Sequence, residues 1–289
     1  MRSGLAKQEV AAELVIIRTS GDRDRQSSLR VIGGKGVFTK ELEDALLEER
    51  IDLAVHSMKD MPTALPAGLE ISAICEREDV RDALISRGGL KLDQLPSGAR
   101  IGTSSLRRQS QLRHYRSDFE MVDMRGNVDT RLAKLARGDY HAIVLARAGL
   151  HRLGKADQIS EIVPTEICLP AAGQGAIGIE SRKRGAEFSA AVRKLNHAPS
   201  QLAVEAERAV LTGLESGCQV PIGVWARMES GSLRIEACVL SADGSESIRE
   251  CRTGSWDKAT ELGQSLAAAL LERGADRLLR LAGRGVEHG

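Results

Sequence analysis

The order of apolar and polar positions predicts strand and helix segments from the start of the chain. Glu13 to Arg18 has the pattern of a buried strand, and residues 39–50 place leucines and alanines on one helical face behind Thr39, a helix-capping residue type. The apolar run from Ile51 to Val55 predicts another strand, and Leu69 to Cys75 alternates as strands do. We therefore expect the first region to contain β-α-β structure.

A second α/β pattern begins near Arg81. The predicted strands are Arg100 to Thr103, Phe119 to Asp123 and His141 to Ala146, and the predicted helices run from Ser104 or Ser105 to Tyr115 and from Asn127 to Ala136. Because strands and helices alternate, we expect a parallel, doubly wound sheet. Residues 169–178 have the pattern of a segment that crosses between regions, and helices are predicted at about 185–195 and 200–214.

The last region has a different pattern. Three predicted strands, Val220 to Met228, Ser232 to Leu240 and Ser247 to Arg252, are joined by short turns, and helices follow at about 257–272 and after Ala275. Strands that follow one another through short turns, with helices at the end, are typical of an α+β domain with an antiparallel sheet.

Composition excludes several classes of function. The 289 residues include 42% hydrophobic and only 2% aromatic side chains, which argues against a stacking surface for single-stranded nucleic acid. A net charge of +1 gives no general attraction to DNA or to anionic membranes. Five scattered cysteines and six unclustered histidines favour a reducing compartment and argue against a metal site. With neither a membrane span nor a signal-peptide pattern, we expect a cytoplasmic protein.

The strand that ends near Val55 is followed at once by polar residues. His56, Ser57, Lys59 and Asp60 lie within five positions at its carboxyl end, which is the rim of an α/β sheet where ligands bind. A carboxylate beside an ammonium at such a rim is suited to proton chemistry. Taken alone, a solvated Lys59–Asp60 pair is the more common interpretation.

The second region carries an excess of arginine. Residues 100–152 contain ten Arg and one Lys against five acidic residues, and the arginines gather at strand–helix junctions. The residues at these junctions are Thr103, Ser104, Ser105, Arg107, Arg108, Arg125, Gly126, Arg131 and Arg152. Single arginines are usually solvated, but successive junctions of one sheet converge on one crevice. A ligand with several carboxylates or phosphates is therefore expected.

Cys218 is the best candidate for an accessible thiol. It lies in a Ser-Gly-Cys-Gln segment of small and polar residues, whereas Cys238 lies in the middle of a predicted strand. A buried inert cysteine is the more common alternative for any single position. The glycine-rich segments at residues 33–36 and 173–175 lack the spacing of a phosphate-binding loop and are interpreted as a lid with a basic residue and as a hinge.

Several long segments together resemble the porphobilinogen deaminase family. The resemblance covers nearly the whole chain from about Glu13. The segments that carry it are Gly33–Gly36, Phe38–Glu43, Ala54–Asp60, Ile74–Asp79, Gly102–Arg108, Arg125–Val128, Thr130–Leu132, Ala172–Ala176 and Gly217–Gly223.

The resemblance implies a fold of two periplasmic-binding-protein-like (type II) α/β domains and a smaller C-terminal α+β domain with a three-stranded antiparallel sheet. The implied domains are 1–76 with 174–196, 77–173, and 197–289. The family is a transferase, hydroxymethylbilane synthase, which condenses four porphobilinogen molecules head to tail on a covalent dipyrromethane cofactor in tetrapyrrole biosynthesis and releases ammonia. A monomer is expected.

The resemblance also assigns roles to residues. Asp60 matches the catalytic carboxylate, which promotes loss of ammonia and stabilises the cationic azafulvene, and Cys218 matches the cysteine that forms a thioether to the cofactor. Cofactor binders are expected at Ser57, Lys59, Thr103, Ser104, Ser105, Arg107, Arg108, Arg125, Gly126, Arg131 and Gln174. Substrate binders are expected at Lys35, Phe38, Arg125, Arg131 and Arg152.

The N-terminus departs from the family pattern. Aligned from Glu13, the chain begins within the family's first helix, so the family's first strand is expected to be missing, and residues 2–6 resemble only a remnant of its Arg-x-Ser-x-Leu-Ala motif. A missing strand would leave an unpaired sheet edge. The alternative functions are therefore a family member impaired in catalysis and an anion-binding protein such as a receptor.

Overall fold

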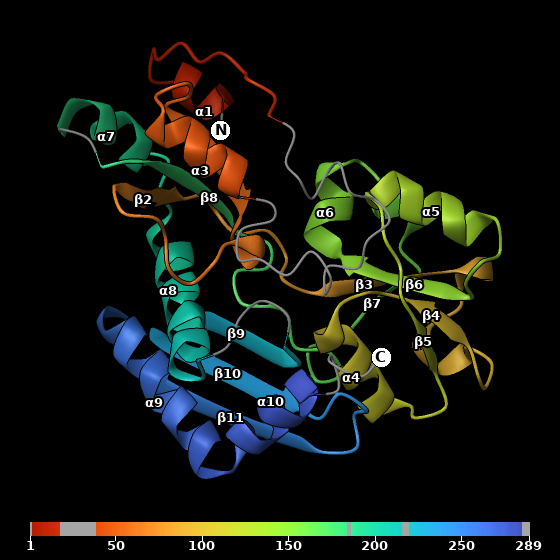
Figure 1. Ribbon diagram of the computed structural model, residues 1–289. Helices are drawn as coiled ribbons and strands as arrows, with labels where there is room; N and C mark the ends of the chain where they lie inside the picture. The colour runs from red at the N-terminus through yellow and green to blue at the C-terminus, as the bar shows by residue number, and fades with distance from the viewer. Residues whose placement is uncertain (1, 18–38, 184–185, 216–219, 285–289) are drawn as a thin grey trace.

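The computed structural model describes residues 2–17, 39–183, 186–215 and 220–284, which form three sheets with helices packed around them (Figure 1). The first sheet has the order β1-β8-β2, with β1 at Leu53–Ser57, β2 at Leu69–Ile74 and β8 at Ile177–Arg182. Both β1 and β2 run antiparallel to β8. The chain thus leaves the first sheet, builds the second, and returns to insert β8 between β1 and β2. The helices of this part are α1 (Arg2–Ala6), α3 (Lys40–Leu47) and α7 (Ala186–Arg193).

The predicted buried strand at Glu13 to Arg18 is wrong. Residues 13–17 have no regular secondary structure, and Arg18 lies outside the described residues. Leu14, Val15 and Ile16 are 71%, 54% and 82% exposed, although they belong to types that favour strands. No described strand pairs with this segment. An apolar strand needs a neighbour to satisfy its backbone groups and cover its side chains, and this segment has none among the described strands.

The second sheet has the order β5-β4-β6-β3-β7, and it is mixed rather than parallel as predicted. Strand β4 is parallel to β5 and β6, whereas β3 is antiparallel to β6 and β7. The chain passes from β3 to β4 through two short 3-10 turns instead of an α-helical crossover, so β3 is free to run the other way. The elements are β3 (Asp82–Ser86), η2 (Arg87–Gly89), η3 (Leu92–Gln94), β4 (Arg100–Gly102), α4 (Leu106–Tyr115), β5 (Glu120–Val122), α5 (Val128–Ala136), β6 (Ala142–Ala146), α6 (Arg147–Arg152), η4 (Ala156–Gln158) and β7 (Glu161–Ile162).

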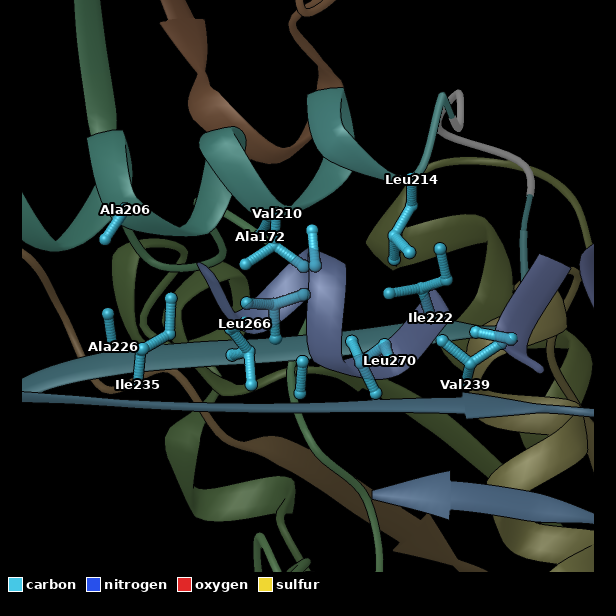
Figure 2. Packing of buried hydrophobic residues seen from close by; sticks show 14 of the residues in the cluster. Ala172, Ala206, Val210, Leu214, Ile222, Ala226, Ile235, Val239, Leu266 and Leu270 are labelled. Atoms are coloured by element: carbon cyan, nitrogen blue, oxygen red, sulfur yellow. The ribbon is translucent and has the colours of Figure 1, made fainter. Parts of the chain in front are cut away.

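The third sheet confirms the predicted antiparallel arrangement, with the order β11-β10-β9. Its elements are α8 (Ala198–Gly213), β9 (Ile222–Glu229), β10 (Ser232–Leu240), β11 (Ser247–Gly254), η5 (Trp256–Lys258), α9 (Ala259–Glu272) and α10 (Ala275–Arg284). Figure 2 shows Val210 of α8, and Leu214 directly after the helix, facing the sheet, where they join Ile235 and Val239 in one buried cluster. Burial of each such side chain contributes about 1.5–3 kcal/mol.

Helices α8 and α9 approach each other closely at Gly263. A Cβ atom there would lie 2.3 Å from the Ala206 carbonyl oxygen, so only glycine permits this packing distance. Most buried apolar residues of the C-terminal α+β part thus form one core cluster, which Ala172 joins from outside that part.

Two segments cross between the first and second sheets, and they are hydrogen-bonded to each other. The Cys75 amide donates to the Ile177 carbonyl at 2.9 Å, and the Glu78 amide donates to the Gly175 carbonyl at 3.2 Å. Gly175 has φ +86°, and a Cβ there would lie 2.5 Å from the Glu78 carbonyl oxygen. Residues 173–175, predicted as a hinge, thus lie in one of two crossing segments that are hydrogen-bonded to each other.

Candidate active site

A small cavity lies where the three sheets meet. Lys59 of the first region and Ser105 and Arg107 of the second line it together with Val220, which directly follows residues 216–219. That segment contains Cys218 and lies outside the described residues, as do Lys35 and Phe38. The remaining lining residues are Met58, Met61, Ala171, Ala172, Arg208, Leu211 and Ile222. The cavity therefore brings together segments that the sequence places more than 150 residues apart.

The 3-10 turn η1 (Met58–Asp60) presents Lys59 and Asp60 at this place. Met58 is 2% exposed and packs against two glycines of the returning chain. A Cβ on Gly173 would lie 2.8 Å from Met58 Cβ, and one on Gly178 would lie 2.2 Å from Met58 Sδ. With Met58 anchored underneath, the next two side chains are held at the rim, where Lys59 is half-buried and Asp60 is exposed.

The charges around Asp60 come from both α/β sheets. Burial lowers the pKa of Lys59, Arg108 and Arg107 lower it further, and Asp60 opposes the change. Burial, with the charges of Arg108 and Arg125, lowers the pKa of Arg131 to about 10, again opposed by Asp60. Asp60 therefore lies close enough to affect cations on both sides.

Arg107 and Arg108 share one buried carboxylate that the sequence reasoning missed. Asp82, the first residue of β3, accepts from Arg107 Nη1 at 2.7 Å through Oδ2, and from Arg108 Nη2 and Nε at 2.7 and 3.1 Å through Oδ1. The two guanidiniums hold the pKa of Asp82 well below its usual range despite full burial. An acidic residue at the start of an otherwise apolar strand is the sequence signal that could have found it.

Gln174 of the second crossing segment joins the same cluster. Its Nε2 donates to Asp82 Oδ1 at 2.9 Å and to the Val80 carbonyl at 2.6 Å, and its side chain is buried. Arg107 donates to the Leu169 carbonyl at 2.6 Å, whereas its Nε is buried without a hydrogen-bond partner among the described residues. The cluster thus links β3, α4 and the crossing.

Hydrogen bonds between the strand–helix junctions align them with each other. The Ser104 hydroxyl donates to the Met124 carbonyl at 2.7 Å and accepts from the Met124 amide at 2.9 Å, so its hydrogen bonds are made within the protein. Thr103 Oγ1, which is buried, accepts from the Ser105 amide at 3.3 Å. As predicted, Asn127 caps α5 by accepting from the Thr130 amide at 2.9 Å.

The remaining predicted site residues lie around this centre. Arg131 donates through Nε to the Gly126 carbonyl at 2.7 Å, and Arg125 lies close enough to lower the pKa of Arg131. Arg152, at the end of α6, donates to the Gly175 carbonyl in the crossing at 2.6 Å. Ser57 ends β1 and pairs with Ile177. Arg152 therefore contacts the hinge in this structure.

The described cysteines include two that are fully enclosed and unreactive. Burial raises the pKa of Cys168 and raises that of Cys238 to about 11, so both thiols are protonated near neutral pH. Burial also raises the pKa of Cys75. Among the described residues, no group of three or more His, Cys, Asp or Glu side chains could hold a metal ion.

Sequence comparisons identify the family. The model "Porphobilinogen deaminase, dipyromethane cofactor binding domain" matches residues 1–190, and "Porphobilinogen deaminase, C-terminal domain" matches residues 201–272. The chain belongs to the porphobilinogen deaminase family. This is a family of transferases in porphyrin biosynthesis that act on porphobilinogen and use a dipyrromethane cofactor, as the sequence resemblance implied.

Two relatives are about half identical to this chain. Porphobilinogen deaminase of Desulforudis audaxviator is 53% identical over 91% of this chain and 85% of its own length. Porphobilinogen deaminase of Pelotomaculum thermopropionicum is 52% identical over 93% of this chain and 86% of its own length. A solved ancestral cationic amino acid solute-binding protein is 13% identical, with a TM-score of 0.40 over 67% of this chain and 75% of its own. No helix in the described part of the chain is long and apolar enough to span a membrane.

Proposed function

We propose that this chain is a hydroxymethylbilane synthase whose chemistry takes place at Asp60. The observation that carries the proposal is the position of this exposed carboxylate on η1, among cations from both α/β sheets and next to the cavity lined by Lys59, Arg107 and Val220. In this activity four porphobilinogen molecules are joined head to tail with release of ammonia, and hydroxymethylbilane is released by hydrolysis.

The residues at the cavity suit a dipyrromethane that carries carboxylate side chains. Lys59 and Arg107 line the cavity, and the buried Nε of Arg107 is a donor without a partner among the described atoms. We assign Cys218 as the thioether attachment point, because Val220, two residues later, borders the same cavity. Once bound, the cofactor supplies the pyrrole carbon to which the first substrate is joined. Further binders are Ser57, Thr103, Ser105, Arg108, Arg125, Gly126, Arg131 and Gln174.

Asp60 is assigned the catalytic role because porphobilinogen becomes positively charged as ammonia leaves. A carboxylate next to that charge stabilises it, and the effect is large where protein groups replace water. Asp60 also accepts a hydrogen bond from the pyrrole N–H, which holds the ring in place. Lys59 and Arg131 lie close to this carboxyl group.

The basic residues are assigned to the acetate and propionate groups of the substrate. Arg125, Arg131 and Arg152 belong to successive junctions of the second sheet, and guanidiniums bind carboxylates in paired geometry. Lys35 and Phe38, outside the described residues, keep the roles that the family resemblance implies. Ser104 is a weaker candidate than its neighbours, since Met124 already occupies its hydroxyl.

The proposal includes the organisation of the chain. The domains are 1–76 with 174–196, 77–173, and 197–289, in agreement with the return of β8 between β1 and β2. We further propose a cytoplasmic monomer, which size-exclusion chromatography with light scattering would test.

Asp60→Asn tests the proposal. The substitution keeps the size of the side chain and removes its charge, so we expect kcat to fall by about 100-fold or more while pyrrole units remain bound to the protein. Uroporphyrin formed from added porphobilinogen reports turnover, and intact mass reports the bound units. The control is Asp157→Asn, an exposed position on η4, which should behave as wild type. Near-normal turnover of Asp60→Asn would exclude the role assigned to it.

A further inference from the structure

We propose that Asp82 is a positioning residue for the reaction: one buried carboxylate fixes the directions of Arg107 and Arg108 and connects them to the crossing segment through Gln174. The inference rests on the proposed function, because it concerns arginines assigned there to the cofactor. Asp82 itself is 0% exposed and lies outside the cavity, so it does not touch the ligand.

The geometry leaves Asp82 little freedom. Its Oδ2 accepts from Arg107 Nη1 at 2.7 Å, and its Oδ1 accepts from Arg108 Nη2 at 2.7 Å and from Gln174 Nε2 at 2.9 Å. Arg108 is also held by the Val144 carbonyl, to which its Nη1 donates at 3.1 Å. Both oxygens are therefore used, by two arginines of α4 and by Gln174 of the crossing segment.

Charge explains why a carboxylate is needed here. Arg107 and Arg108 are adjacent in sequence and both are less than 10% exposed, so without an anion they would repel each other in a poorly solvated place. One carboxylate reduces the pair from two positive charges to a net charge of one. The remaining charge is then available to the acidic side chains of the cofactor, at a fixed position.

The cluster also acts on Lys59. Asp82 raises the pKa of Lys59, whereas Arg108 and Arg107 lower it. Asp60 also raises the pKa of Lys59. Loss of the Asp82 charge should therefore lower the pKa of Lys59. The Lys59 ammonium, which lies beside Asp60, would then lose its proton at a lower pH than in the wild type. A residue with a purely structural role would not produce this change.

Asp82→Glu and Asp82→Asn separate geometry from charge. Asp82→Glu keeps the charge but moves the carboxylate by about one bond length, so kcat/KM should fall roughly 10- to 100-fold with no shift of the alkaline limb of its pH profile. Asp82→Asn should lower kcat/KM further and move that limb to lower pH. Asp139→Asn, which removes an exposed pair with Arg137, is the control and should match wild type.

Two readouts distinguish the possible failures. Arginine side-chain ¹⁵N spectra of the full chain should show slowly exchanging guanidinium signals for Arg107 and Arg108 in wild type and altered signals in both variants. If these signals change but wild type forms no uroporphyrin, the positioning holds and the proposed function fails. If wild type is active and Asp82→Glu keeps wild-type signals and kcat/KM, the positioning is refuted, whether or not Asp82→Asn folds.

Discussion

Glu207 on α8 is expected to be the most sensitive position for stability outside the site. Its side chain is 0% exposed and accepts four hydrogen bonds. Arg77 of the first crossing donates at 2.7 and 2.9 Å, the Gly173 amide of the second crossing at 2.6 Å, and the Ala226 amide of β9 at 2.8 Å. One carboxylate thus joins both crossing segments to the third sheet.

Glu207→Gln keeps the shape of the side chain but turns one acceptor into a donor. One pair of N–H groups then faces an NH₂ group, and Arg77, 9% exposed at its side chain, loses its counter-charge. Removing one partner of a buried ion pair costs about 3–5 kcal/mol. For a chain of this size such a loss lowers the melting temperature by on the order of 10 °C.

Thermal and urea unfolding followed by far-UV circular dichroism at pH 7 measures this loss. The control is Arg137→Gln, which removes an exposed pair with Asp139 and should change the free energy of unfolding by less than about 1 kcal/mol. If Glu207→Gln also changes it by less than about 1 kcal/mol, the buried carboxylate does not hold the crossings as inferred.

Three further substitutions test the surroundings of the site. Burial raises the pKa of Glu43, assisted by the charge of Glu180, so its contribution to stability is present below pH 4.5 and is lost as pH rises through the higher folded value. Glu43→Gln should therefore melt at a higher temperature than wild type, with a difference that grows from pH 4.5 to 7; a difference independent of pH would contradict this. Gly126→Ala should raise KM for porphobilinogen and lower stability by about 1–3 kcal/mol, because Gly126 has φ +111° and a Cβ would lie 2.6 Å from Thr130 Cγ2; unchanged melting would refute it. Arg131→Lys should raise KM more than it lowers kcat in steady-state assays, since it keeps the charge but loses the Nε donor to Gly126, and an equal effect on both would argue against substrate binding there.

Periodicity predicted most helices and strands because each depends on local burial. The third sheet was predicted with its direction, since short turns between consecutive strands permit only an antiparallel arrangement. The direction of β3 was not predicted correctly, because it depends on the path of the chain between strands β3 and β4. The strand predicted at Glu13 to Arg18 was wrong, because a strand forms only beside a neighbour, which a local pattern does not reveal.

The sequence likewise predicted only those site residues whose positions depend on the local strand and helix pattern. Lys59 and Asp60 follow a strand and could be placed at its rim from the sequence, and the arginines could be placed at strand–helix junctions. Asp82 and Glu207 were missed because their partners are distant in sequence: Gln174 is 92 residues from Asp82, and Arg77 is 130 residues from Glu207. Such pairs become visible only when the crossing segments are placed in space.

The most direct test of the central claim is the intact mass of the purified chain compared with Cys218→Ser. The account predicts that wild type is heavier than its sequence by two linked pyrrole units, that added porphobilinogen increases the mass in further single-unit steps, and that Cys218→Ser has the mass of its sequence alone. A wild-type chain with no added mass, before and after exposure to porphobilinogen, would contradict the account.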